Sequence, residues 1–322
     1  MIVTCALQSQ IVILVVDRSE TVKGALMVTT NEHMAMELAS QPDTWARAAG
    51  MTREQGLLPS SGLRVAIVGC GTSWFMAQSY AALRESTGHG VTDAFAASES
   101  FVGRGYDAII ALTRSGTTTE VLELVQSHRG SAPIIGIVGD VSSPLVNEVD
   151  EVIALPFADE TSVVQTRFAT TALALLRSSL GENLDRAIAD AEVAVTENLD
   201  DALVNAEQYT FLGRGWGVGL ANEAALKMRE ATQSWTESYP AMEYRHGPIS
   251  IAAPNRVVWM LGLPPTGLVQ DVERTGARYV SSALDPMAEL VRVHRLALLR
   301  ARAMGLNPDL PRNLTRSVIL DS

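Results

Sequence analysis

The sequence predicts an α/β protein that contains parallel sheets and consists of two units of similar plan. Apolar runs of strand length, such as Leu63–Val68 and Ile134–Val138, each lead into a glycine- or hydroxyl-rich turn and then into a helical stretch. Near-continuous apolar runs are typical of strands that are buried on both faces. The pattern recurs about 145 to 150 residues downstream, where Tyr209–Gly215 echoes Val65–Gly71. A hydrophobic content of 47% with 24 glycines fits many tight strand-to-helix turns.

The first unit alternates strands and helices along the chain. A helical stretch from His33 to Ala49 precedes it. We expect this stretch to be interrupted at Gln41–Pro42, because proline disrupts a helix interior. The elements expected after it are, in order, strand Leu63–Val68, helix Trp74–Ser86, strand Ala108–Leu112, helix Val121–His128, strand Ile134–Val138, strand Val152–Leu155 and a helix after Thr166.

The second unit repeats this plan. Arg256–Thr266 and the helical stretch that follows it echo Asp107–His128, and the boundary between the units is expected within Phe168–Glu207. We therefore divide the chain into an N-terminal extension (1–30), a first α/β unit (31–185) and a second α/β unit with a C-terminal tail (186–322).

Residues 1–30 do not resemble the rest of the chain. The apolar run Ile11–Val16 is too short to span a bilayer, and it lacks the flanks of a signal peptide. Met27 begins a more natural start, so we expect residues 1–26 to be a poorly ordered arm or the product of a misassigned start. With only two cysteines, Cys5 and Cys70, the protein is expected in the cytoplasm.

Charge and composition limit the possible partners. The net charge of −11 argues against nucleic acid and against an anionic membrane. The five histidines are scattered, so we expect no metal site. The turn Gly69–Trp74 lacks the third glycine of a dinucleotide fingerprint, and no triphosphate P-loop occurs, so no cofactor is expected.

Hydroxyl side chains gather where the first two strands end. In a parallel sheet these turns share the crevice edge, and hydroxyls with helix-start N–H groups can bind an anion such as a phosphate. The alternative is that they are helix N-caps, but one cap per helix does not explain so many hydroxyls in seven residues. The residues concerned are Thr72, Ser73, Thr113, Ser115, Thr117 and Thr118.

A helical stretch in the second unit and the segment after it carry side chains suited to acid–base chemistry. Glu223, Lys227 and Glu230 lie at i, i+4 and i+7, so they share one face, and His246 follows just before Gly247–Pro248. A solvent-exposed Glu223–Lys227 pair is the alternative. The chain has only two lysines among 25 basic residues, however, which indicates a role for Lys227 that arginine cannot fill.

Together these segments resemble the SIS (sugar isomerase) family, most closely the isomerase half of glucosamine-6-phosphate synthases and the stand-alone glucosamine-6-phosphate deaminases. The resemblance runs from about Met34 to the tail. It implies two flavodoxin-like three-layer αβα subdomains. The segments that carry it are GCGTS (69–73), TRSGTTTE (113–120), ETSVVQTR (160–167), LGRG, EAALKMRE and RHGP within 212–248, and PRNLTRSV (311–318).

The resemblance also implies a site for an aldose or ketose 6-phosphate. Glu230 would move the proton between C1 and C2, Lys227 would lie near the sugar hydroxyls, and Glu223 would support the site. His246 would help to open the sugar ring and would come from the partner of a homodimer. The implied substrate-binding residues are Gly71, Thr72, Ser73, Thr113, Arg114, Ser115, Thr118, Val163, Gln165 and Arg316.

The sequence departs from the family pattern at four points. The glutaminase segment of the synthases has no counterpart here, and Cys5 lacks the context of its nucleophile. Thr113 replaces a serine, Gln165 replaces a small residue, and Arg316 replaces a tail lysine. A guanidinium stays protonated and cannot form an imine, so Lys227 is the remaining candidate for one.

The expected function is therefore a sugar-phosphate isomerase coupled to deamination, which converts glucosamine 6-phosphate to fructose 6-phosphate and ammonia. A fructosamine-phosphate deglycase and an aminotransferase or isomerase without a glutaminase are the alternatives among enzymes. A non-catalytic sugar-phosphate sensor is the alternative of another class. Against the sensor, Glu223, Lys227, Glu230 and His246 are all present.

Overall fold

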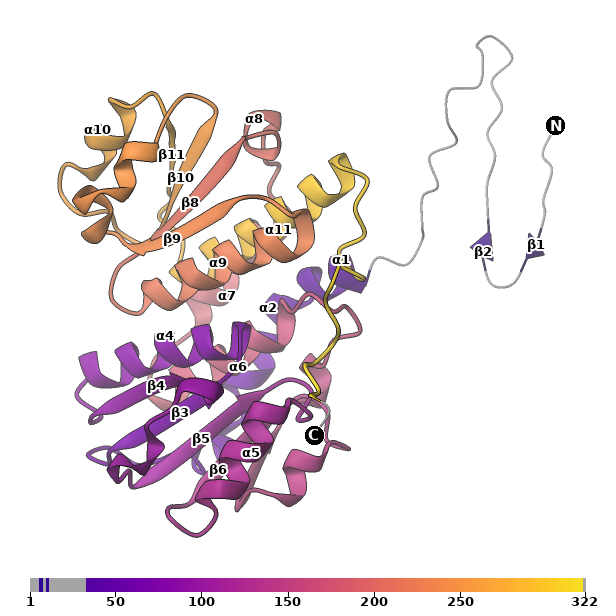
Figure 1. Ribbon diagram of the computed structural model, residues 1–322, viewed down its shortest axis with the longest axis vertical. Helices are drawn as coiled ribbons and strands as arrows, with labels where there is room; N and C mark the ends of the chain where they lie inside the picture. Colours follow the sequence, from indigo (N-terminus) through magenta and orange to yellow (C-terminus); the bar gives the residue numbers. More distant parts are fainter. Residues whose placement is uncertain (1–5, 8–9, 12–32, 321–322) are drawn as a thin grey trace.

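The computed structural model describes residues 6–7, 10–11 and 33–320 and contains two parallel sheets, each with helices on its faces (Figure 1). The predicted α/β class is confirmed. The first sheet has five strands in the order β4-β3-β5-β6-β7, and the second has four in the order β11-β10-β8-β9. The strands of the first sheet are β3 (Val65–Gly69), β4 (Thr92–Ala96), β5 (Ala108–Thr113), β6 (Ile134–Val138) and β7 (Glu151–Ala154).

Successive side chains of β3 and β5 point to opposite faces of the sheet, and this produces two apolar cores in the first unit. Ile67 and Ile110 point to the face covered by α4 (Thr72–Ser86) and α6 (Arg167–Ser179). Val68 and Ala111 point to the opposite face, where α5 (Thr119–His128) packs. Because both faces are covered, β3, β5 and β6 are buried along their whole length, which explains their continuous apolar sequences.

The second sheet repeats the topology of the first. In each unit the first strand, β3 or β8, lies between the second and third strands, which is the arrangement of flavodoxin-like sheets. The strands are β8 (Gln208–Gly213), β9 (Thr236–Pro240), β10 (Arg256–Leu261) and β11 (Arg278–Val280). The helices are α9 (Gly217–Thr232), α10 (Leu268–Glu273) and α11 (Pro286–Ala303).

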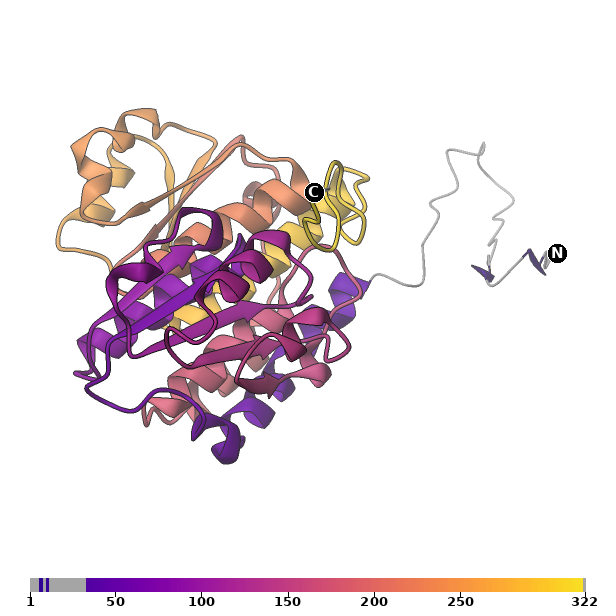
Figure 2. The same cartoon turned by 60° about the horizontal axis from the view of Figure 1, so that its bottom comes forward.

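The helices that flank the sheets join the two units. The larger core runs from the first unit into α9 and α11 of the second. At the start of the chain, α1 packs on α11, and α2 packs on α6 and α7. The first unit lies in front in Figure 2. The helices not yet given bounds are α1 (His33–Ala39), α2 (Gln41–Ala49), α3 (Thr52–Gln55), α7 (Asp185–Ala194) and α8 (Asp201–Val204). The boundary expected at residue 185 stays a prediction.

The sequence did not predict three strands of the two parallel sheets. β4 and β9 are edge strands of half-buried, mixed composition, and β11 has only three residues. An edge strand is covered less completely than a central one, so it does not need a continuous apolar run. Residues 97–99, 102–104, 144–147, 156–158, 243–246 and 248–251 form short 3-10 turns at the ends of strands or in loops.

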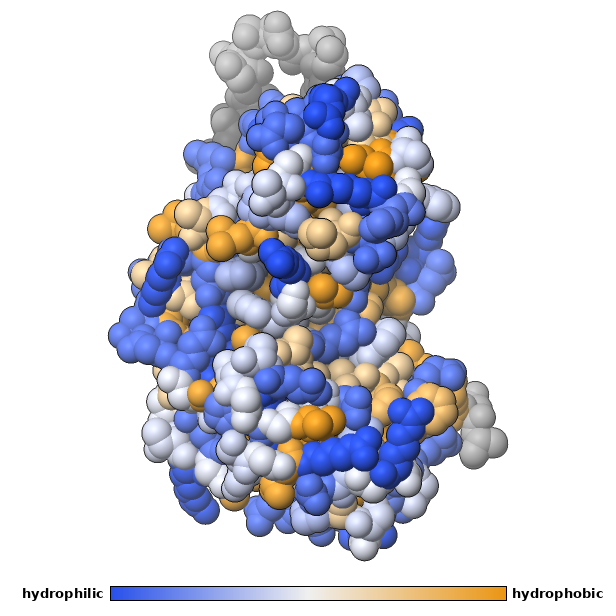
Figure 3. All heavy atoms as spheres, turned by 90° about the vertical axis from the view of Figure 1, so that its left-hand side faces the viewer, coloured by the Kyte–Doolittle hydropathy of each residue, from blue (hydrophilic) through white to orange (hydrophobic). Residues whose placement is uncertain are grey.

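Only two short strands of the N-terminal segment are described. β1 (Ala6–Leu7) and β2 (Gln10–Ile11) form a two-stranded antiparallel pair, whereas most of the predicted extension 1–30 lies outside the described residues. Within residues 33–320 no helix is long and apolar enough to cross a membrane. The face in Figure 3 shows hydrophilic residues over most of its area, with apolar residues in small groups.

Candidate active site

Helices α4 and α9, one from each unit, pack at unusually close range. A Cβ atom on Gly219 of α9 would lie 2.3 Å from the carbonyl oxygen of Phe75 on α4, so only glycine permits this approach. Two hydrogen bonds fix the register: Ser79 Oγ donates to the Trp216 carbonyl at 2.9 Å, and Asn222 donates to Gln78 at 2.7 Å. The first turn of α4 therefore faces the middle of α9.

Three of the four charged residues of α9 form one cluster, and one of them, Glu223, contacts this first turn. Thr72 Oγ1 donates to Glu223 Oε1 at 3.3 Å, and Lys227 Nζ lies 3.4 Å from the same oxygen. Lys227 also forms a close ion pair with Glu230. The side chains of Glu223 and Lys227 are 1% exposed and that of Glu230 is 18% exposed, so the alternative of a solvent-exposed pair is excluded. Glu230 is the carboxylate that a ligand can reach.

Burial gives this cluster unusual acid–base properties. Desolvation, followed by repulsion from Glu230, raises the pKa of Glu223 to about 8 against the pull of the Lys227 charge. Glu223 Oε2 is buried and has no hydrogen-bond partner among the described residues, as expected for a carboxyl that tends to stay neutral. Burial alone would lower the pKa of Lys227, but Glu223 and Glu230 outweigh burial and raise it. Glu223, Lys227 and Glu230 therefore form one buried cluster in which the three ionisations are coupled.

The hydroxyl-rich loop after β5 is braced by its own side chains. The Gly116 N–H donates to Thr113 Oγ1 and the Thr117 N–H donates to Ser115 Oγ, both at 3.3 Å. Thr118 is the N-cap residue of α5 but makes no capping hydrogen bond with its side chain. The N-cap alternative therefore fails for Thr118. Thr113 and Ser115 accept from the backbone, which leaves their O–H groups able to donate to an anion.

This loop and the start of α4 occupy the same edge of the first sheet. β3 and β5 are neighbouring parallel strands in which Val68 pairs with Ala111, so the segments after them begin side by side. Gly71, with φ of 53°, turns the chain into α4, and both Thr72 and Ser73 are buried. The sheet brings the predicted anion-binding residues of the two segments together.

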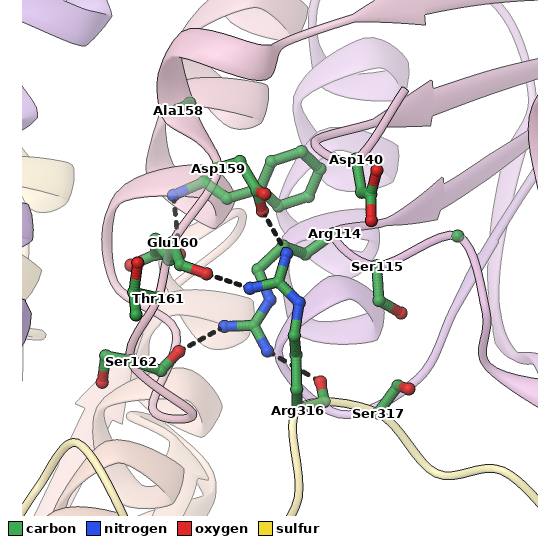
Figure 4. Close-up of polar contacts among 12 residues, drawn as sticks. Arg114, Ser115, Asp140, Ala158, Asp159, Glu160, Thr161, Ser162, Arg316 and Ser317 are labelled. Carbon is green, nitrogen blue, oxygen red and sulfur yellow. Dashed lines mark hydrogen bonds and ion pairs between the residues drawn. The ribbon is translucent and has the colours of Figure 1, made fainter. Parts of the chain in front are cut away.

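The C-terminal tail lies across this edge (Figure 4). Thr117 Oγ1 and Ser317 Oγ lie 2.8 Å apart, and the Thr119 N–H donates to the Val318 carbonyl at 3.2 Å. Arg114 donates to the Arg316 carbonyl at 2.7 Å, while Arg316 itself pairs with Asp159 at 2.6 Å. The tail is thus anchored to the loop and to the segment after β7.

Arg114 and Arg316 were expected to bind substrate, and in the structure both hold protein atoms. Arg114 is 2% exposed and also donates to the carbonyls of Ser162 at 2.8 Å and Val163 at 3.3 Å. Its hydrogen bonds connect the loop after β5 to the tail and to the segment 160–167. Substrate contacts by these arginines, by Val163 and by half-buried Gln165 stay predictions.

Glu160 is a residue of this region that the sequence did not single out. Its buried carboxylate accepts from the backbone N–H groups of Thr166 at 2.7 Å, Arg167 at 2.8 Å and Phe168 at 3.0 Å. These N–H groups belong to the start of α6, so its N-terminus is already occupied by an anion of the protein. Glu160 is also near enough for its charge to act on Lys227.

His246 lies apart from the cluster in this chain. It is exposed at the end of the turn Glu243–His246, and no hydrogen bond or ion pair links it to Glu223, Lys227 or Glu230. Contribution of His246 to a neighbouring subunit's site therefore stays a prediction. Within the described part of the chain, no group of three or more His, Cys, Asp or Glu residues could hold a metal ion.

A family model and curated relatives match parts of this sequence. Residues 57–178 match the family model described as the SIS domain. A glutamine–fructose-6-phosphate aminotransferase (isomerizing) from Aeropyrum pernix is 29% identical over 89% of this chain and 57% of the relative. One from Neisseria meningitidis serogroup B is 26% identical over 89% of this chain and 58% of the relative. The chain spans about half the length of the curated relatives it matches.

Solved structures share the fold. The glucosamine-6-phosphate deaminase of Thermotoga maritima matches with a TM-score of 0.73 and 22% identity, over 89% of this chain and all of that one. The C-terminal domain of a glucosamine-fructose-6-phosphate aminotransferase from Francisella tularensis matches with a TM-score of 0.76 and 19% identity, over 87% and 99%. At these identities the matches show a shared fold.

Proposed function

We propose that this chain binds a hexosamine 6-phosphate and couples aldose–ketose isomerisation to deamination, converting glucosamine 6-phosphate to fructose 6-phosphate and ammonia. The observation that carries the proposal is the link between Thr72 and Glu223 at 3.3 Å. It joins the hydroxyl-lined edge of the first sheet to the acid–base cluster of the second unit. A phosphate held at the first would place the sugar carbons toward the second.

The reaction needs one proton to move between adjacent carbons. In the open-chain aminosugar, removal of the C2 proton gives an enolamine, and return of a proton to C1 gives an imine at C2. Water then adds to this imine, the C–N bond breaks, and the products are the ketose and ammonia. Without a nitrogen substituent at C2, the same proton transfer is a plain isomerisation.

The cluster supplies groups suited to these steps. Glu230 is the reachable carboxylate and serves as the base, because a general base must approach the proton it removes. Lys227 stays an ammonium beside it and offers donors to the sugar hydroxyls or to the developing enolate oxygen. Glu223, whose pKa is raised by burial, accepts from Thr72 and lies beside Lys227, so it holds both side chains in position.

The test is a panel assay on wild-type protein. Glucosamine 6-phosphate, fructose 6-phosphate and fructosamine phosphates are each incubated in deuterated water, and ammonia release and C2 proton exchange are followed. We expect both with glucosamine 6-phosphate. Exchange without ammonia would identify an isomerase, and amine release from fructosamine phosphates alone would identify a deglycase. Binding of sugar phosphates without either reaction would support the sensor.

We also propose a homodimer in which His246 completes the neighbouring site, because exposed His246 makes no contact with the cluster of its own chain. Mixing His246→Ala with Glu230→Gln subunits should then restore part of the activity, since some hybrid sites carry both intact groups. The activity of the mixture is compared with that of each variant alone. No recovery after verified subunit exchange would contradict a shared site.

A further inference from the structure

Glu37 is a buried carboxylate of α1 that the proposed reaction does not use. The residue is 4% exposed, and its Oε1 accepts from the backbone N–H groups of Thr161 at 2.6 Å and Ser162 at 3.3 Å. Within the described part of the chain these two N–H groups have no other acceptor. Glu37 therefore holds a segment that lies more than a hundred residues further along the chain, since 124 positions separate it from Thr161.

The helix that carries Glu37 is itself anchored. The N–H groups of His33 and Met34 at its start donate to the carboxylate of Asp309, both at 2.8 Å. Met34 is buried, and α1 packs on α11. Glu37 therefore reaches the segment 160–163 from a rigid element, which a side chain that sets the position of others requires.

The same segment supplies acceptors for Arg114. Its Nη1 donates to the carbonyls of Ser162 at 2.8 Å and Val163 at 3.3 Å, and its Nη2 donates to the carbonyl of Arg316 at 2.7 Å. The bonds to Ser162 and Arg316 are drawn in Figure 4. A guanidinium stays charged, so one that is buried depends on these carbonyls.

Arg114 stands inside the predicted anion-binding loop, between Thr113 and Ser115. Its own carbonyl accepts from the N–H groups of Gly139 and Asp140, both at 3.0 Å, so the turn after β6 holds its backbone. Its side chain is held by the segment after β7 and by the tail. A shift of that segment would therefore act on the loop through this side chain.

We propose that Glu37 is a positioning residue for the anion-binding loop 113–119, and that it acts through the segment 160–163 and Arg114. In the proposed function, on which this inference rests, the loop binds the phosphate of the sugar. Glu37 fixes two consecutive N–H groups, and the carbonyls that follow them in the chain are thereby presented to Arg114. Without this acceptor the segment is free to relax away from the guanidinium.

Other contacts of the segment do not replace Glu37. The Val163 N–H donates to the carbonyl of Asp309 at 3.1 Å, and Ser162 Oγ donates to the carbonyl of Pro308 at 3.5 Å. Both bonds tie the segment to the stretch after α11. They leave the two N–H groups that face the carboxylate without an alternative partner, and a buried N–H group without a partner is costly.

One oxygen of the Glu37 carboxyl accepts both hydrogen bonds. Oε2 is buried without a hydrogen-bond partner among the described residues, and burial, followed by repulsion from Glu160, raises the pKa of Glu37. A side-chain amide offers the same acceptor without a charge, so Glu37→Gln should keep the segment in place. Glu37→Met has a similar length but no acceptor for the two N–H groups.

The experiment measures binding of fructose 6-phosphate by calorimetry in Glu37→Met, Glu37→Gln, Arg114→Met and the double variant with both methionines. Glu289→Met is the matched control, because Glu289 is also buried and accepts hydrogen bonds in the second unit. Urea unfolding shows which variants are folded. Glu37→Asp, which withdraws the acceptor by one methylene, is used if Glu37→Met does not fold. Hydrogen exchange of the loop 113–119 without ligand reads the loop itself.

Glu37→Met should weaken binding of fructose 6-phosphate by about 10- to 10²-fold. It should also speed exchange of the Gly116 and Thr117 N–H groups, which are bonded within the loop. Glu37→Gln and Glu289→Met should match wild type in both measurements. In the Arg114→Met background, Glu37→Met should have little further effect on binding, because the two residues act along one path.

Fully additive effects of Glu37→Met and Arg114→Met on binding would overturn the proposal. Loop exchange at the wild-type rate in Glu37→Met would also overturn it, as would equal losses in Glu37→Met and Glu289→Met. If wild type binds no sugar phosphate, the proposed function fails, while the exchange rates, measured without ligand, still decide whether Glu37 positions the loop.

Discussion

The two units share one topology but carry different chemistry at corresponding places. In the first unit the central strand β3 leads to Thr72 and Ser73, and its neighbour β5 leads to Thr113 and Ser115. In the second unit β8 leads through Gly213–Gly217 without a hydroxyl, and the ionisable side chains appear further along α9. One unit offers neutral donors at a sheet edge, whereas the other offers charges on a helix face.

In the proposed function, the first unit supplies the groups that bind the phosphate and the second supplies the acid–base groups. Neutral hydroxyls and backbone N–H groups bind a phosphate without adding a charge that would perturb the nearby acid and base. Charges on a helix face are buried by packing and acquire shifted pKa values, as Glu223 and Lys227 do. The close crossing of α4 and α9 at Gly219 brings the two contributions together.

The largest expected effect is on kcat, and it follows from changing Glu230 on α9. Glu230→Gln keeps the shape of the side chain but removes the base, so kcat for deamination should fall by about 10²- to 10⁴-fold, with sugar-phosphate binding kept. Ammonia release and C2 proton exchange should fall together. Glu192→Gln, which changes an exposed glutamate on α7, is the control. Unchanged turnover in Glu230→Gln would assign the base elsewhere.

Loss of a hydroxyl from the loop after β5 in the first unit should affect substrate binding instead of kcat. Ser115→Ala removes an O–H donor, and a hydrogen bond to a charged group contributes about 1.5–3 kcal/mol. KM for the phosphorylated sugar should therefore rise by roughly 10- to 150-fold while kcat changes little. Ser131→Ala, at an exposed turn, serves as the control. If KM is the same in both variants, the loop 113–119 does not bind the phosphate.

The crossing of the two helices can be tested through stability. In Gly219→Ala the new Cβ would meet Phe75 O at 2.3 Å and Ser79 N at 2.8 Å, so α4 and α9 must separate. Overpacking should outweigh the gain in helix propensity and leave a net loss of about 1–2 kcal/mol in the free energy of unfolding. Urea unfolding measures it. Gly103→Ala, where no atom lies within 4 Å, should cost less, and equal losses would contradict tight packing at Gly219.

The smallest effect concerns pH. The folded-state pKa of Glu223 is raised to about 8, so the protonated form favours folding, and this contribution is complete below pH 4.5 and lost as the pH rises toward 8. Glu223→Gln is neutral throughout. Wild type should therefore lose at least about 1 kcal/mol more than Glu223→Gln between pH 5 and 8 in urea unfolding. Parallel curves would show that Glu223 is ionised in the folded protein.

The sequence predicted the fold well where burial is complete. β6 was predicted with its observed bounds, and β3 and β5 to within two residues, because strands covered on both faces need continuous apolar runs. The break between α1 and α2 was predicted from Pro42. Edge strands β4 and β9 are covered on fewer sides, so their sequences resemble loops.

The candidate site was predictable only in part. Spacing over about two turns of helix revealed Glu223, Lys227 and Glu230, because helix geometry is local. The contacts of Arg114 depend on segments that are distant in sequence, such as that with Arg316, so the local pattern carries no signal of them.

The contact between α1 and the segment after α11 has a consequence for unfolding. The carboxylate of Asp309, after the last helix, accepts from the N–H groups of His33 and Met34 at 2.8 Å, and α1 packs on α11. A fragment that stopped near residue 185 would leave α1 without α11, and one that began there would expose the face of α11. The two halves should therefore melt in a single transition, and neither fragment should refold when expressed without the other.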